Sequence, residues 1–386
     1  MDWRKGVSIA EATTSIWLPP SHECIDPPIS TEVVVVGAGL TGLTIAQRLS
    51  AQGAKVVVLE KKGKIADGMA TRGMGIASIM LLDPPFRLIQ AVGLDIAKQI
   101  TRFTREGVAL WGPRIDPVGV GYLPKGKGEC EELEDNLKAL SMLGVAAEPW
   151  EDHGFPMLGK GWRQPQGGTF DPQTSMCELA KGVRIVANQK VVSIEDDGFD
   201  LMVHTDKNRR VRADLVVMTG GAQVTPWAKA KFHPVRHQAL ATEATEAVLP
   251  FPAHLQYGYT SIRQTVEGRI VAAGCRWASP HMEVGETDDT IINPAVHTKL
   301  MGFLHQHFPS TANLDVTHQW SAIMTFSCDG LPVIGPLPGR PRIISCGGFG
   351  AFGPSLSLRA AKAVVDGITT GESPGVPACF STQRFD

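Results

Sequence analysis

Residues 31–62 read TEVVVVGAGLTGLTIAQRLSAQGAKVVVLEKK, and this stretch decides the fold. The valine run Val33–Val36 is typical of a central parallel strand that is buried on both faces. The G-x-G-x-x-G spacing after it predicts a tight turn, a close approach of backbone to a pyrophosphate, and close packing of a helix on the sheet. Its glycines are Gly37, Gly39 and Gly42.

The residues that follow complete a nucleotide-binding unit. A helix is expected to start near Leu40 and to continue through Leu43–Gln52, so that a phosphate can bind the free N–H groups at its first turn. A second strand, Lys55–Leu59, ends on Glu60. A carboxylate at that position can accept hydrogen bonds from both ribose hydroxyls of an adenosine. The stretch therefore predicts a dinucleotide site rather than a simple glycine-rich turn.

Composition limits the class of protein. The chain has 386 residues, of which 43% are hydrophobic and 20% charged, and this favours a globular protein of two domains over a disordered or membrane protein. Its formal net charge of -2 shows no basic excess, so nucleic acid is not an expected partner. The first residues contain no apolar signal segment, and we expect no membrane span.

The cysteines are scattered along the chain. They are odd in number and never form a C-x-x-C pair, which indicates free thiols in a reducing compartment and a cytoplasmic location. His233 and His237 have the spacing of a metal pair on a helix, but Pro234 between them disfavours a helix. We expect no metal site.

The rest of the chain indicates two kinds of sheet. Ala213–Met218 is the return strand that a nucleotide-binding fold needs, whereas strands alternate from Val235 to Gly274 as in an antiparallel sheet. Phe86–Trp111 is expected to form one helix. We predict an α/β (α+β) two-domain fold: a Rossmann-like dinucleotide-binding domain and a second domain on an antiparallel sheet. The expected boundaries are residues 1–30 for an N-terminal arm, 31–111, 170–234 and 318–386 for the discontinuous dinucleotide-binding domain, and 112–169 and 235–317 for a substrate domain.

Several motifs together resemble one known family. These are the VVVVGAGLTGLTIAQRL segment, the central FDPQTSMCELA and ADLVVMTGGA, and the terminal DGLPVIGP and GGFGAFGP. In this order they resemble the FAD-dependent D-amino-acid oxidase family, which includes glycine and sarcosine oxidases, D-amino-acid dehydrogenases and γ-glutamylputrescine oxidases. The resemblance covers nearly the whole chain, and the terminal pair of motifs is what indicates FAD.

The resemblance implies an FAD site made of four parts of the chain. The glycine turn and Glu60 would hold the pyrophosphate and the ribose, a loop would run beneath the pyrophosphate toward the ring, and a terminal loop would meet the pyrimidine end of the flavin. A helix starting near Ser355 would direct its positive end at that loop. The residues implied are Gly37, Ala38, Gly39, Leu40, Thr41, Gly42, Glu60, Lys61, Ala70, Thr71, Arg72, Gly73, Met74, Val191, Gly220, Gly221, Gly348, Phe349, Gly350, Ala351, Phe352, Gly353, Pro354 and Ser355.

The sequence departs from the family at the substrate. Two basic residues that grip a substrate carboxylate in monomeric sarcosine oxidases match Gly75 and Ser355 here. Arg263 or Arg276, on the alternating sheet, could supply a bidentate grip instead, although each could equally be a surface or domain-interface arginine. Tyr257, Tyr259, Trp320 and Phe352 are possible walls of an apolar cavity, or plain core residues. As substrate-positioning residues the sequence predicts Arg263, Arg276, Tyr259 and Phe352.

Two further departures concern the flavin. A lysine that helps oxygen react in those oxidases matches the apolar strand Ile270–Ala273, so a dehydrogenase with another electron acceptor stays open beside an oxidase. The cysteine that ties FAD in some relatives matches Ala322, and Cys328 is displaced from it. We therefore expect non-covalent FAD and a packed thiol at Cys328.

The resemblance implies an enzyme that oxidises the C–N bond of an amine or amino acid by hydride transfer to flavin N5, giving an imine that hydrolyses. The expected partners are that small substrate and O2 or another electron acceptor. Two alternatives stay open. One is a flavin-binding partner subunit or scaffold without amine turnover, and the other is an NAD-dependent dehydrogenase.

Overall fold

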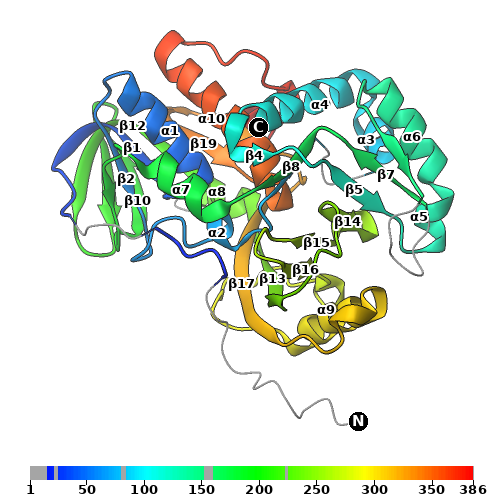
Figure 1. Cartoon of the computed structure of the whole chain (residues 1–386). Helices are drawn as coiled ribbons and strands as arrows, with labels where there is room; N and C mark the ends of the chain where they lie inside the picture. Colours follow the sequence, from blue (N-terminus) through cyan, green and yellow to red (C-terminus); the bar gives the residue numbers. More distant parts are fainter. Residues whose placement is uncertain (1–14, 21–24, 80–83, 152–159, 222–224, 386) are drawn as a thin grey trace.

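The computed structural model describes residues 15–20, 25–79, 84–151, 160–221 and 225–385, which form two large sheets, one small sheet and their covering helices (Figure 1). The first large sheet has a parallel core, and the second is mostly antiparallel. The predicted α/β fold with a second, antiparallel sheet is therefore confirmed. Within the described ranges, no helix combines the length and apolar character needed to cross a bilayer.

The first sheet is built around the quoted valine strand. β1 (Ser30–Val36) pairs in parallel with β2 (Val56–Leu59) on one side and with β12 (Arg210–Gly220) on the other. Val33–Val36 are buried in it, as the unbroken apolar run predicts. β12 contains the predicted return strand. The outer strands are β9 (Ile185–Val186), β10 (Val191–Asp196), β11 (Leu201–Thr205), β18 (Val333–Leu337) and β19 (Arg340–Gly347).

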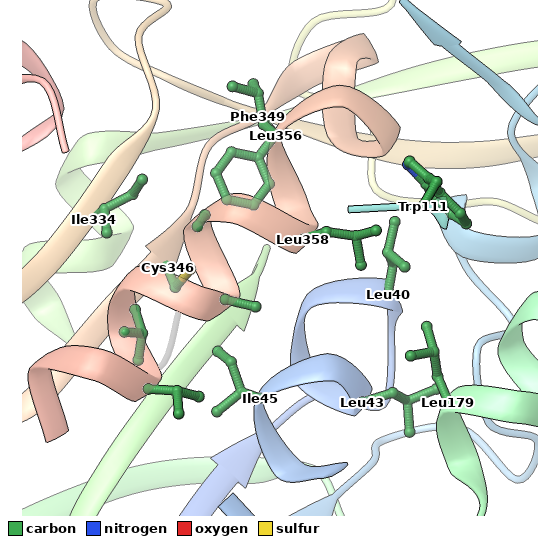
Figure 2. Close-up of a cluster of buried hydrophobic side chains, with 14 of the residues drawn as sticks. Leu40, Leu43, Ile45, Trp111, Leu179, Ile334, Cys346, Phe349, Leu356 and Leu358 are labelled. Carbon is green, nitrogen blue, oxygen red and sulfur yellow. The ribbon is translucent and has the colours of Figure 1, made fainter. Parts of the chain in front are cut away.

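Two helices from opposite ends of the chain lie side by side near this sheet. α1 (Leu40–Ala51) follows the glycine turn, and α10 (Gly353–Thr370) follows the terminal glycine loop. Figure 2 shows Leu40 and Ile45 of α1 on the side of the helix that carries Leu356 and Leu358, whereas Leu43 lies beside Leu179. The Thr41 hydroxyl also donates to Ser357 Oγ at 3.1 Å. This contact brings the two glycine loops into one region of the molecule.

The second sheet has the strand order β17-β13-β16-β15-β14-β5-β7-β6. Every pair is antiparallel except β14 with β5. Helix α9 (Pro294–His307) packs on one face, and the opposite face looks toward the first sheet (Figure 1). The strands are β5 (Val120–Leu123), β6 (Glu148–Trp150), β7 (Gly161–Gln164), β13 (Phe232–Ala244), β14 (Ala253–Leu255), β15 (Thr260–Gln264), β16 (Arg269–Gly274) and β17 (Val316–Ser327).

Strand β17 differs from the expected division of the chain. Residues from 318 onward were assigned to the FAD-binding domain, but β17 pairs with β13 from Val316 to Ser327 in the antiparallel sheet. The long alternating apolar pattern of Trp320, Ala322 and Met324 on one face is what a strand of such a sheet requires. The other domain boundaries stay predictions.

The region between the two sheets contains short elements. β3 (Ile76–Ser78), β4 (Ile115–Asp116) and β8 (Gly167–Phe170) form the small sheet, and α7 (Pro172–Ala180) follows it. Remaining helices are α2 (Met69–Arg72), α3 (Pro85–Val92), α4 (Leu94–Ala109), α5 (Lys127–Glu131), α6 (Leu133–Met142) and α8 (Pro226–Lys231).

The predicted single helix Phe86–Trp111 is wrong. Gly93, at φ 80°, separates α3 from α4, because a residue with positive φ ends the hydrogen-bond pattern of an α-helix.

In the N-terminal arm, Trp17 is buried against Trp320 and small apolar residues of the second sheet. Residues 1–14 and 21–24 of the predicted arm lie outside the described residues.

Gly107 sets how closely α4 packs on the start of α10. A Cβ at Gly107 would lie 2.0 Å from the Ser355 carbonyl oxygen, whereas a Cβ at Gly302 in α9 would meet nothing within 4 Å. We expect Gly107→Ala to destabilise the protein by about 1–3 kcal/mol because the helices must separate. Gly302→Ala is the control, and its better helix propensity should add up to about 1 kcal/mol. Thermal unfolding of both variants measures the difference; equal Tm values would contradict the packing described.

Candidate active site

Each glycine of the G-x-G-x-x-G turn has its own structural role. Gly37 has φ +105°, which L side chains rarely adopt. A Cβ at Gly42 would lie 1.9 Å from the Gly37 carbonyl oxygen, so α1 can approach β1 only with glycine there. A Cβ at Gly39 would meet nothing within 4 Å. Gly39 therefore leaves open space in front of the first turn of α1, where a phosphate can bind free N–H groups.

Glu60 lies beside this turn at the end of β2. Its Oε2 accepts the Ala38 N–H at 2.8 Å, and its Oε1 accepts the Lys62 N–H at 2.8 Å. From the opposite side, the Thr219 hydroxyl of β12 donates to the Val36 carbonyl at 2.8 Å. The carboxylate is thus fixed next to the backbone that would hold a pyrophosphate. These residues form a cradle that fits the adenosine half of FAD.

The predicted loop Ala70–Met74 contains helix α2 and contacts the second sheet. Arg72 donates to Asp67 Oδ1 at 2.8 Å and to the Ser321 carbonyl of β17 at 3.0 Å. The Trp320 indole N–H donates back to the Arg72 carbonyl at 2.8 Å. The Arg72 side chain is therefore held by protein groups.

The terminal loop has a similar geometry. Gly348 and Gly350 have φ +72° and +53°, and a Cβ at Gly350 would lie 2.4 Å from the Phe326 ring. Helix α10 begins at Gly353, two residues before the predicted start, and no side chain caps it. Ser355 Oγ accepts the Ser78 N–H at 3.2 Å, so this side chain connects α10 to β3.

The remaining predicted FAD residues lie at the edges of these parts. Val191 begins β10 and is buried in the same apolar cluster as Val36 and Leu59. Gly220 ends β12, and a Cβ at Gly221 would lie 2.3 Å from Thr325 Oγ1. Lys61 follows Glu60 directly, Ala351 lies in the 3-10 helix Gly350–Phe352, and Pro354 is the second residue of α10. Direct contacts of all these residues with FAD stay predictions.

The face of the second sheet that looks toward the first sheet carries polar residues that the sequence analysis did not single out. Strand register places Tyr122, His254 and Ser261 in one row across β5, β14 and β15. His254 Nδ1 and Ser261 Oγ are 2.8 Å apart. Burial lowers the pKa of His254 to about 4, so its imidazole is neutral at neutral pH. No sequence signal marked this row, because it depends on which strands become neighbours.

Arg263 lies on this face, and its guanidinium donates hydrogen bonds to backbone carbonyl groups. Its Nη1 donates to the carbonyl oxygens of Met74, Gly75 and Phe170 at 2.9–3.1 Å, and the Trp17 ring covers its guanidinium at 5.5 Å. A Cβ at Gly75 would lie 2.5 Å from Arg263 Nη1. The arginine from β15 therefore fills the space next to Gly75, where relatives were expected to carry a basic side chain. Burial lowers the pKa of Arg263 to about 10.

Arg276 lies closer to the terminal glycine loop. Its guanidinium is 4.8 Å from the centre of the Tyr259 ring and 5.7 Å from that of the Phe326 ring, which abuts Gly350. Its one hydrogen bond among the described residues goes to the Met282 carbonyl at 3.3 Å, and no described carboxylate pairs with it. Burial lowers the pKa of Arg276, as expected for a cation without a counter-ion.

The charge of Arg276 also affects His237, on the face of the second sheet that looks toward the first sheet. Burial, and then the charge of Arg276, lowers the pKa of His237 to about 4. His237 pairs with Ala322 across β13 and β17, so it shares the face that looks toward the first sheet. The structure thus gathers Arg276, Tyr259 and a neutral histidine near the terminal loop.

A cavity of about 350 Å³ opens beside Arg276. It shares Tyr259 and Met282 with the surroundings of that arginine. Its lining residues are Lys125, Gly126, Glu129, Gln256, Tyr257, Tyr259, Trp277 and Met282. Tyr257 and Tyr259, two of the predicted cavity walls, do line a cavity.

Backbone strain concentrates at the same place. Of the eight described non-glycine residues with positive φ, five lie in or next to this cavity. Such backbone conformations are energetically unfavourable, and they are often found at functional sites. The five are Gln256, Tyr257, Cys275, Met282 and Glu283.

Other candidate residues have different positions. Trp320 is fully buried in the core and does not line the cavity beside Arg276. Phe352 directly precedes α10 and is partly buried against the core of the first sheet. Cys328 is exposed, so the expectation of a packed thiol is wrong, and the six described cysteines are free.

Comparison with known proteins identifies the family of the chain. The model of the family described as DAO, FAD dependent oxidoreductase, matches residues 32–367. The sarcosine oxidase subunit beta of Arthrobacter sp. is 24% identical, over 96% of this chain and 94% of that protein. The bifunctional protein MnmC of tRNA 5-methylaminomethyl-2-thiouridine biosynthesis from Azoarcus sp. (strain BH72) is also 24% identical, over 83% of this chain and 52% of that protein.

Solved structures agree on the fold. The L-proline dehydrogenase from P. horikoshii superimposes with a TM-score of 0.77 at 19% identity, over 93% of this chain and 98% of that chain. At this identity the likeness describes the architecture of the chain alone.

The glycine turn allows a matched pair of variants. We expect Gly42→Ala to lower Tm by several degrees, because its Cβ would collide with the Gly37 carbonyl. We expect Gly39→Ala to keep Tm of the cofactor-free protein but to weaken FAD binding by at least about tenfold, since its methyl group would occupy the phosphate space. Titration of FAD by fluorescence quenching, with Tm of the cofactor-free protein, separates the two effects. Wild-type FAD affinity in Gly39→Ala would contradict the assignment.

The partly buried histidine of β14, His254, predicts a pH effect on stability. The pKa of His254 is about 4 in the folded protein and 6.5 in its ordinary state, so the unfolded chain binds more protons between these values. Stability from this group is therefore full above about pH 6.5 and is lost as the pH falls toward 4. We expect His254→Gln to have a smaller decrease of Tm between pH 7 and pH 4.5 than the wild-type protein; an equal decrease would show that His254 is not buried as a neutral group.

Proposed function

The chain belongs to the DAO family of FAD-dependent oxidoreductases, and from this premise we propose that it oxidises the C–N bond of an amine or amino acid. FAD is the cofactor of the family, and when bound it supplies the hydride acceptor for such an oxidation. The glycine turn, Glu60 and the terminal loop would hold it non-covalently. The names of relatives, such as a sarcosine oxidase subunit and an L-proline dehydrogenase, favour amino-acid substrates.

The observation that carries the proposal is the environment of Arg276. A partly buried guanidinium that has one hydrogen bond and no described carboxylate partner is a costly arrangement in the absence of a ligand. A substrate carboxylate would provide the missing counter-ion through bidentate hydrogen bonds. Because the Phe326 ring connects Arg276 to Gly350, this carboxylate would lie next to the loop assigned to the flavin. We therefore assign substrate binding to Arg276.

Arg263 has a different role in this proposal. Two of its hydrogen bonds hold the Met74 and Gly75 carbonyls of the loop, a third goes to the Phe170 carbonyl of β8, and Trp17 covers the guanidinium. Arg263 thus positions the loop beneath the cofactor and leaves the substrate to Arg276. Its Nε is buried and has no hydrogen-bond partner among the described residues.

Neutral groups around the cavity suit amine oxidation. The amine must be unprotonated before hydride leaves the adjacent carbon, and a neutral imidazole can accept a hydrogen bond from its N–H without adding positive charge. His237 provides such a group within the electrostatic reach of Arg276. Tyr259, 37% exposed, stands at the entrance with its ring against the guanidinium. Together they would orient the amino group relative to a carboxylate held by Arg276.

Replacement of each arginine by glutamine, in separate variants, tests the role assigned to Arg276. We expect Arg276→Gln to raise the KM for an amino-acid substrate by at least about tenfold, because the charge-assisted bonds to the carboxylate are lost, with a smaller effect on amines that lack a carboxylate. Arg263→Gln is the matched control and should lower Tm and FAD content instead. Anaerobic mixing with a panel of amines and both enantiomers of amino acids identifies the substrate through the loss of flavin absorbance. Steady-state rates with that substrate then give the KM of each variant.

The panel also separates the alternatives. Bleaching of the flavin by an amine supports the enzyme, whereas no reduction by any member of the panel would favour a flavin-binding subunit without amine turnover. An Arg276→Gln variant with the KM of the wild-type protein would contradict the role of Arg276.

A further inference from the structure

Positive side chains without acidic partners gather at the cavity beside Arg276. Lys125 lines the cavity and is partly buried, with its Nζ 5.2 Å from the centre of the Phe303 ring. Lys299 of α9 has its Nζ 5.9 Å from the centre of the Trp277 ring, which also lines the cavity. Burial raises the pKa of the Cys275 thiol, and the charges of both lysines act in the opposite direction and lower it. Arg276 follows Cys275 directly, so the cations converge on one short segment.

The neighbouring carboxylates are committed to other groups. Glu129 lines the cavity, but its two oxygens accept the backbone N–H groups of Tyr257 and Lys125, each at 2.8 Å. Glu283 is paired with Arg236 at 2.6 Å, and Glu132 is paired with Arg87. Among the described residues, no ion pair involves Lys125, Lys299 or Arg276. Lys125 and Glu129 are the two charged residues in the cavity lining and carry opposite charges, and the further cations Arg276 and Lys299 next to the cavity make the local charge positive.

Aromatic rings form part of the cavity lining. Tyr257, Tyr259 and Trp277 provide aromatic surfaces, and an ion pair that forms against such surfaces is screened less than one in open water. Arg276 stands between the cavity and the terminal glycine loop, because it contacts Tyr259 and Met282 on one side and Phe326 on the other. A substrate whose carboxylate binds Arg276 would extend its other end toward Lys125.

We propose that this cavity binds a second anionic group of the substrate, so that the protein acts on an amino acid with a carboxylate at each end. The proposal rests on the function proposed above for the choice of substrate, but the binding of a dicarboxylate can be measured without turnover. Lys125 would contact the distal carboxylate, and Lys299 would add attraction from the rim. The aromatic walls would contact the carbon chain between the two charges.

Equilibrium dialysis of radiolabelled glutarate against the purified FAD-loaded protein tests the proposal. We expect glutarate to bind at least about tenfold more tightly than butyrate, its counterpart with a single carboxylate. Lys125→Met keeps the aliphatic stem against Phe303 and removes the charge, and it should reduce glutarate affinity by about tenfold with little change for butyrate. Lys127→Met is the matched control, since Lys127 is exposed and paired with Glu131 outside the cavity.

The outcomes separate this proposal from the proposed function. Equal affinities for glutarate and butyrate, or equal glutarate affinities in Lys125→Met and Lys127→Met, would overturn the anion site whether or not any amine reduces the flavin. If Lys125→Met fails to fold, Lys299→Met provides the same test, because Lys299 is exposed on α9 and its removal leaves the cavity wall intact. Tight glutarate binding together with an inert flavin would support the site and contradict the oxidation of amines.

Discussion

The close contact between Gly42 and the Gly37 carbonyl is the constraint on which the rest of the structure depends. With no room for a Cβ, helix α1 reaches the valine strand directly, and Thr219 of a strand distant in sequence completes the packing. This contact fixes the first turn of α1 beside Glu60 and leaves open space in front of Gly39. Helix α10 then packs on α1 through Thr41 and Ser357, which brings the terminal glycine loop to the same site (Figure 2).

The substrate side shows a linked pair of changes relative to the family pattern. Glycine at position 75 and arginine at position 263 depend on each other, since any side chain at Gly75 would meet the Arg263 guanidinium. Arg263 consequently supports the loop. The positive charge available to a ligand lies at Arg276 instead, near the terminal loop and the cavity. In the proposed function, the grip on the carboxylate has moved from the loops of the FAD-binding part to the antiparallel sheet.

Sequence patterns predict what is local and repeated in this protein. The valine run, the glycine spacing and the acid at Glu60 are patterns of a few adjacent residues, and they predict the parallel core and a dinucleotide site. FAD was indicated by the resemblance of the terminal motifs to a known family. The break at Gly93 was missed because a single glycine is tolerated in many helices. The row of Tyr122, His254 and Ser261 and the cluster of Lys125 with Lys299 could not be predicted, because strand order and helix placement bring these residues together. Arg263 and Arg276 looked equivalent in the sequence, and only their neighbours distinguish them.

A crystal structure of the FAD-bound protein with benzoate, a simple carboxylate ligand, tests the central claim most directly. The account predicts the benzoate carboxylate on the Arg276 guanidinium, beside Tyr259 and within reach of the flavin ring at the terminal loop, with Arg263 still bonded to the carbonyls of Met74, Gly75 and Phe170. Benzoate bound to Arg263 with Trp17 displaced, or a flavin ring distant from Arg276, would contradict it.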